Sequence, residues 1–115
     1  MKTLYFFLLI ALLFLPLPLP GHNGEYNTWS NLIYCEPAAC IHEVGHKLDD
    51  LAGFGLAVSS SPEWRSMIDD LGGDDYIETY ARMFAFAEGK QENMPVLLRP
   101  FYDWELAQEL LKDYQ

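Results

Sequence analysis

Residues 37–52 read PAACIHEVGHKLDDLA and predict an amphipathic helix with two histidines on one face. Pro37 suits the first turn of a helix, because its missing N–H costs nothing there. His42 and His46 lie four residues apart, so their imidazoles can point toward the same metal ion. Apolar residues recur at spacings of three and four, as on the buried face of a helix: Ile41, Val44, Leu48 and Leu51.

The pattern HEVGH, residues 42–46, is typical of two zinc ligands with a general base between them. Zinc takes imidazole nitrogens at about 2.0–2.1 Å. Glu43 lies one step around the helix from His42, where it flanks the ion instead of binding it. Gly45 leaves room for a close approach by another element. The alternative is a solvated helix face with two unrelated histidines.

A catalytic zinc usually has three protein ligands and one open position, so the third ligand must be sought elsewhere. A histidine six residues after His46 would indicate a metzincin, but Ala52 stands there and Asp49 replaces the expected glycine. His22 is the only other histidine, and it lies beside a predicted cleavage point. Glu78 is the best candidate, because an unpaired carboxylate is expensive in so apolar a helix. A salt bridge or an exposed position near the helix start would also explain it.

HEVGH followed by ETYARMFAFA, residues 78–87, resembles gluzincins whose third ligand opens an E-x-x-A-x-x-F-A helix. The matching positions are Glu78, Ala81, Phe84 and Ala85. The order of segments over about residues 39–105 is most similar to the catalytic domain of anthrax-lethal-factor-like peptidases. The ImmA/IrrE-type regulators share the same two motifs and rank second.

The resemblance implies a zinc endopeptidase that acts on a peptide or protein substrate. It implies His42, His46 and Glu78 as zinc ligands and Glu43 as the general base. Such peptidases usually carry a sheet before the zinc helix, whose edge strand holds the substrate, and only residues 21–36 are available for it here. Two other functions stay open: a non-catalytic zinc-stabilised binding module or degenerate peptidase, and a small acidic interaction protein without metal.

Three further residues are candidates for supporting roles. Tyr76 and Tyr80 flank Glu78 and are candidate oxyanion donors, although tyrosines in such helices more often belong to the core. Asp49 follows His46 by one turn and could accept the other ring N–H of a ligand histidine. It could equally be a solvated acid near the end of the helix.

Residues 1–21 predict a secretory signal peptide or an uncleaved membrane anchor. Lys2 precedes an apolar run from Leu4 to Leu15, and alternating Pro and Leu follow. The run is short for a membrane span, which needs about 20 residues. We therefore expect a zincin-like domain at residues 22–115 that is extracytoplasmic, either secreted or membrane-anchored.

Cys35 and Cys40 are the two cysteines of the chain. In an exported protein they predict a small disulfide loop just before the histidine helix, with two free thiols as the alternative.

The chain carries 17 acidic residues against 7 basic ones, a net charge of -10. Such a charge excludes nucleic acid as a partner and disfavours anionic membrane surfaces. We expect membrane contact only through the N-terminal segment, if it is uncleaved.

The 115 residues are enough for one small domain. We expect a mainly α fold with about four helices and at most a minor strand pair. The helices are predicted at residues 37–52, at 62–71 after a capping Ser61, from about Asp74, and from Phe101. Residues 21–34 are expected to form a loop followed at most by one short strand, NLIY, residues 31–34.

Overall fold

The computed structural model describes residues 24–53 and 55–114. The predicted signal or anchor, the cleavage point and His22 lie outside the described residues. The fold is mainly α, as predicted, with one antiparallel pair of strands. Its main elements are β1 (Gly24–Asn27), β2 (Leu32–Cys35), α2 (Cys40–Ala52), α3 (Pro62–Asp70), α4 (Tyr76–Phe86) and α5 (Trp104–Leu111).

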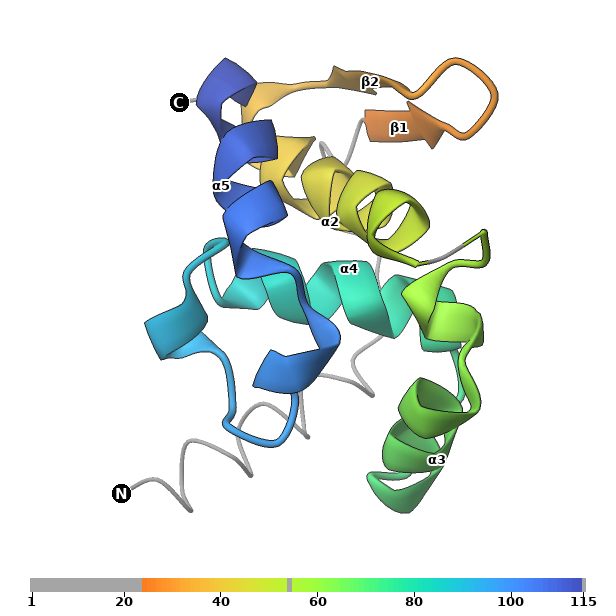
Figure 1. The fold of residues 1–115 in the computed structure, drawn as a ribbon. Helices are drawn as coiled ribbons and strands as arrows, with labels where there is room; N and C mark the ends of the chain where they lie inside the picture. The colour runs from red at the N-terminus through yellow and green to blue at the C-terminus, as the bar shows by residue number, and fades with distance from the viewer. Residues whose placement is uncertain (1–23, 54, 115) are drawn as a thin grey trace.

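Helix α2 lies between the strand pair and α4, while α3 and α5 pack at the sides (Figure 1). The predicted first helix begins as a short 3-10 turn, Pro37–Ala39, and becomes α-helical at Cys40. It ends at Ala52, where the chain doubles back. A Cβ on Gly53 would overlap the backbone carbonyl of Leu56, so this reversal requires glycine.

The two strands form a hairpin in which Gly24 pairs with Cys35 and Asn27 pairs with Leu32. The prediction of a loop was wrong for residues 24–27, which form β1. The turn makes its own hydrogen bonds, because Asn27 Oδ1 accepts the backbone N–H groups of Trp29 (2.9 Å) and Ser30 (3.2 Å). Asn31 takes a left-handed conformation with φ 58°, which asparagine tolerates better than most residues.

The other helices begin where a polar side chain caps them. Ser61 accepts the N–H of Trp64, as predicted. Asp75 caps α4, so that helix begins at Tyr76 and not at Asp74. Asp103 caps α5, which begins at Trp104; the predicted start at Phe101 was too early, because Phe101 belongs to a separate 3-10 turn.

The core is built around α4 and is strongly aromatic. The Tyr80 ring stacks on Tyr102 at 4.1 Å, and Trp64 meets Tyr80 edge-on at 5.0 Å. Val44 and Leu48 of α2 face this core and are fully buried. Leu51, predicted on the apolar face of the first helix, lies outside the core and is 41% exposed, and Ile77 of α4 is 56% exposed.

Candidate metal centre and cleft

The close packing of α2 against α4 positions the candidate ligands. A Cβ on Gly45 would lie 2.9 Å from the Cα and 3.2 Å from the carbonyl oxygen of Ala81, so a larger residue would separate the two helices. Glu78 precedes Ala81 by about one helical turn. The glycine within HEVGH therefore allows Glu78 to reach the histidine face of α2.

The side chains of His42, His46 and Glu78 converge. His42 Nε2 lies 3.2 Å from Glu78 Oε2, and His46 Nε2 lies 3.0 Å from Glu78 Oε1. The two Nε2 atoms are 3.2 Å apart. One candidate ligand atom from each residue lies within 4.8 Å of the others, close enough for all three to bind one metal ion.

These distances fit a tetrahedral metal site. Ligand atoms at 2.0–2.1 Å from a tetrahedral ion are about 3.3 Å from one another. The 3.2 Å between the two imidazole nitrogens is close to this value, and each of these nitrogens lies 3.0 to 3.2 Å from a different oxygen of Glu78. Two imidazole nitrogens and one carboxylate oxygen are also ligand types that zinc accepts, with a fourth position left for water.

The electrostatics of the cluster favour a bound cation. Hydrogen bonds with His42 and then His46 hold the pKa of Glu78 well below its usual range, so this carboxylate is ionised at neutral pH. Burial alone would lower the pKa of His46. The hydrogen bond and charge of Glu78, with the charges of Glu43 and Asp49, outweigh that effect and raise it.

Glu43 is 3% exposed and lies beneath the hairpin. A Cβ on Gly24 would lie 2.7 Å from Glu43 Cγ and 2.9 Å from Oε2, so only glycine lets β1 cross this close to the carboxylate. Glu43 also lines the cleft that contains the three candidate ligands. The requirement for Gly24 could not be read from the sequence, because it comes from the approach of a strand.

Asp49 is only 2% exposed, so it is not a solvated acid. Its Oδ1 accepts the backbone N–H of Ser59 at 2.7 Å, which fixes the loop after α2 to the helix. Burial raises the pKa of Asp49, and the hydrogen bond from Ser59 offsets part of that effect. Its charge also acts on His46. A hydrogen bond to a ligand histidine stays a prediction.

The candidate oxyanion donors Tyr76 and Tyr80 both have their hydroxyl groups hydrogen-bonded elsewhere. The Tyr76 hydroxyl donates to Asp69 at 2.7 Å. Tyr80 is fully buried, and its hydroxyl donates to the carbonyl of Phe101 at 2.7 Å. Neither residue lines the cleft, since each hydroxyl is held on another part of the molecule.

Tyr26 and Asp50 belong to the site region and were not predicted. The Tyr26 hydroxyl donates to Asp50 Oδ2 at 2.6 Å and lies 2.9 Å from Asn31 Oδ1. Burial, and then the hydrogen bond and charge of Asp50, raise the pKa of Tyr26, so the hydroxyl keeps its proton at neutral pH. Both residues line the cleft. This contact fastens β1 to the last turns of α2.

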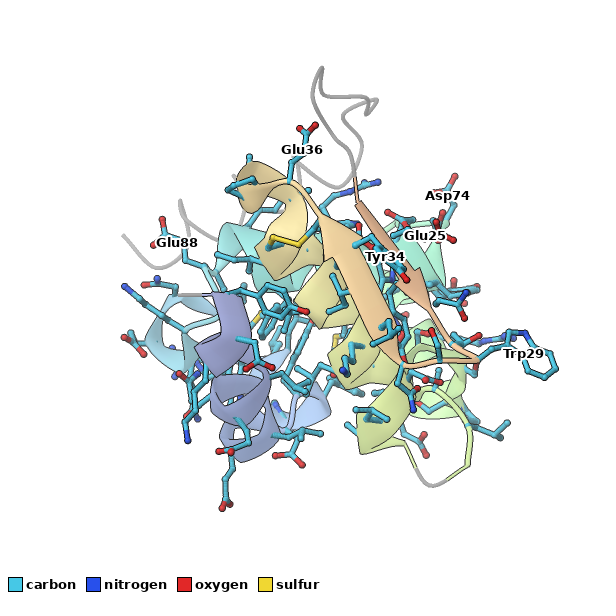
Figure 2. The ribbon with its side chains drawn as sticks, turned by 90° about the horizontal axis from the view of Figure 1, so that it is seen from above. Glu25, Trp29, Tyr34, Glu36, Asp74 and Glu88 are labelled. Atoms are coloured by element: carbon cyan, nitrogen blue, oxygen red, sulfur yellow. A yellow bond between two sulfur atoms is a disulfide. The ribbon has the colours of Figure 1, made fainter. Side chains whose placement is uncertain are left out.

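The predicted disulfide is present between Cys35 and Cys40, with an S–S distance of 2.07 Å. It joins the last residue of β2 to the first residue of α2, and Figure 2 shows it at the base of the hairpin. The hairpin is therefore attached to α2 at two places, the disulfide at one end and the Tyr26–Asp50 hydrogen bond at the other.

The cleft is an open hollow of about 420 Å³ between β1, α2, the segment after α2 and the start of α4. Its lining includes the acidic residues Glu25 and Asp50 in addition to Glu43, Asp49 and Glu78. Neither lysine nor arginine is among the residues that line it. The cleft therefore carries a negative potential that attracts cations.

A search against protein-family models found no match, and comparisons with curated proteins and with solved structures found no significant match either. In the part of the chain that the structure describes, no helix is both long and apolar enough to span a membrane.

Proposed function

We propose that this chain is a zinc-dependent peptidase of the gluzincin type. His42, His46 and Glu78 hold the ion, and Glu43 is the general base. The convergence of the two imidazoles and the carboxylate, close enough to share one ion, carries this proposal. The ion would act as a Lewis acid toward water and toward the scissile carbonyl.

Glu43 takes the proton from the attacking water and passes it to the leaving amine. Its place one residue after His42, facing the same cleft, supports this role. Its burial beneath β1 restricts the carboxylate to a few orientations and limits its access to bulk water.

The hairpin supports a peptide as the substrate. Among the described residues, β1 pairs with β2 along one edge only, and residues of β1 line the cleft. The backbone groups on the other edge can hydrogen-bond to an extended peptide laid across the zinc site, as in β-strand addition. The 24–35 hairpin can thus serve as the edge strand, within the short stretch of residues 21–36 that precedes the zinc helix.

A location outside the cytoplasm is part of the proposal. The Cys35–Cys40 disulfide supports it, because such bonds persist mainly in oxidising compartments. The signal or anchor predicted at residues 1–21 supports it independently. The acidic cleft and the net charge of -10 argue against nucleic acid as a substrate.

Replacement of the general base tests the proposal. We expect Glu43→Gln to keep its zinc and to lose roughly 10²- to 10⁴-fold in hydrolysis of a peptide mixture, the usual contribution of general acid–base catalysis. Glu25→Gln is the matched control, since Glu25 is an exposed carboxylate in the wall of the same cleft. His42→Ala should lose both zinc and hydrolysis.

Full activity in Glu43→Gln would show that the mechanism is wrong. A zinc-loaded wild type that cleaves no peptide would leave a non-catalytic, zinc-stabilised binding module as the function.

A further inference from the structure

The cleft continues past the first turn of α4 into a second hollow of about 360 Å³. Ser59 and Ile77 line both hollows, so the two adjoin along these residues. Ile77 is 56% exposed and directly precedes the candidate ligand Glu78 in the sequence. A substrate chain that leaves the metal site on this side would cross Ile77 and enter the second hollow.

The second hollow differs from the cleft in its charge. Among the described residues that line the two hollows, Arg65 is the only lysine or arginine, and it lies in the second one. Asp74 and Asp75 line the same hollow. The carboxylate of Asp75 is already engaged, because it accepts the backbone N–H of Glu78 at 3.0 Å. The second hollow therefore offers a positive group that the cleft lacks.

The Arg65 guanidinium is held in a defined position and is unpaired. It lies over the Tyr76 ring, 5.1 Å from the ring centre. Tyr76 is itself fixed, because its hydroxyl donates to Asp69 at 2.7 Å and its carbonyl accepts the indole N–H of Trp64 at 2.9 Å. Arg65 makes no hydrogen bond or ion pair with any of the described residues, although the chain has 17 acidic side chains. Its N–H donors are thus left for a ligand.

A carboxylate is the group that fits this position. Arginine presents parallel N–H donors that match the two oxygens of a carboxylate. The cleft around the candidate ligands is acidic and repels such a group. A peptide with a carboxylate near its scissile bond is therefore bound most favourably when that carboxylate lies beside Arg65.

The distance from the metal site to Arg65 can be estimated across α4. Tyr76 and Glu78 are two positions apart, so their side chains leave the helix on nearly opposite sides. A helix with its side chains is about 10–12 Å across. An extended peptide covers that distance in about three to four residues.

We propose that the second hollow binds a carboxylate of the substrate peptide through Arg65, within about four residues of the scissile bond. The carboxylate belongs either to the C-terminus of the peptide or to an aspartate or glutamate side chain. This inference rests on the proposed peptidase function and names the substrate class of the same site.

The test begins with the peptides that the enzyme cleaves. Full-length, zinc-loaded wild type is incubated with a tryptic digest of a bacterial proteome, and cleaved bonds are identified by mass spectrometry. A cleaved peptide with a carboxylate within four residues of the bond is synthesised together with a version that carries an amide there. A C-terminal amide tests the terminal carboxylate, and Asn or Gln in place of Asp or Glu tests a side chain.

Kinetics on the matched peptides measure the contribution of Arg65. In wild type we expect the amide to have a kcat/KM about tenfold lower than the acid, through KM, as for one charge-assisted contact. Arg65→Gln should cleave the acid and the amide equally. Arg65→Lys should keep part of the preference, because it retains the charge without the paired donors. Lys112→Gln is the control and should behave as wild type, since Lys112 is exposed and lines neither hollow.

Three results would overturn the inference while the proposed function stands. The first is a set of cleaved bonds without a carboxylate within four residues. The second is a wild type that cleaves the acid and the amide equally. The third is a preference that persists in Arg65→Gln, even if this variant is slower on both peptides, which would indicate a structural role. A zinc-loaded wild type that cleaves nothing in the digest would instead remove the proposed function, and the inference with it.

Discussion

The two sides of α2 are held by different forces. Toward α4, Val44 and Leu48 are fully buried, and Gly45 brings the helices into backbone contact. Toward the hairpin, no residue of β1 or β2 is buried, and Ile33 of β2 is only partly buried against the core. The hairpin is attached through the disulfide and through the Tyr26–Asp50 hydrogen bond.

This difference separates two tasks in the proposed enzyme. The candidate ligands come from α2 and α4, so the hydrophobic core sets the geometry of the metal site. The wall above the site comes from the hairpin, whose apolar contact with the core is limited to partly buried side chains such as Ile33. Damage to the core should therefore weaken metal binding, whereas damage to the hairpin attachments should weaken hydrolysis and leave the metal in place.

The largest effect is expected from the core. Phe84 is fully buried in α4, and Phe84→Ala should lower the free energy of unfolding by about 3–5 kcal/mol. Zinc affinity should fall as well, because the same helix carries Glu78. Denaturant titration and zinc titration measure the two effects. Leu97→Ala, at an exposed site, should change stability by less than about 0.5 kcal/mol. A destabilised Phe84→Ala with unchanged zinc affinity would contradict the link between core and metal.

Removal of the disulfide should have a smaller and different effect. Cys35 and Cys40 are five positions apart in the sequence, and so short a loop contributes about 2 kcal/mol to the free energy of unfolding. In Cys35→Ser/Cys40→Ser we expect stoichiometric zinc but reduced hydrolysis, because β1 is no longer held over Glu43. Metal analysis measures the zinc content of the variant, and a peptide assay on the same sample measures its hydrolysis. A parallel loss of zinc would show that the hairpin supports the ligands directly.

The smallest effect is expected at the other attachment. Tyr26→Phe removes the hydrogen bond to Asp50 and should lower the free energy of unfolding by about 1 kcal/mol. Its main signature should be a raised KM with unchanged zinc content. Tyr34→Phe is the control, because Tyr34 is 63% exposed on the outer face of β2. Equal kinetics in the two variants would show that the Tyr26–Asp50 hydrogen bond does not affect substrate binding.

The parts of the site that depend on local geometry could be predicted from the sequence. The pairing of His42 with His46 follows from helical periodicity alone. Glu78 is remote in sequence, but it could be predicted as the third ligand because an unpaired carboxylate is costly in so apolar a helix. Helical periodicity also explains why Tyr76 and Tyr80 do not line the cleft: residues two positions from Glu78 lie about 200° around the helix and face away from it.

The hairpin was harder to predict, because strand pairing is a tertiary property. GEYN, residues 24–27, contains Gly and Asn and carries weak strand preference, so it was predicted as a loop. Its pairing with residues 32–35, together with the disulfide, places it over α2. Tyr26 and Gly24 acquire their places in the cleft only through that placement.

The most direct test of the central claim is the zinc content of purified protein, measured by mass spectrometry for metals after dialysis against metal-free buffer. The claim predicts one zinc ion per chain in the wild type and in Glu43→Gln. It predicts a large loss of zinc in both His46→Ala and Glu78→Ala. A wild type without zinc, or a Glu78→Ala variant that binds zinc as tightly as the wild type, would contradict it.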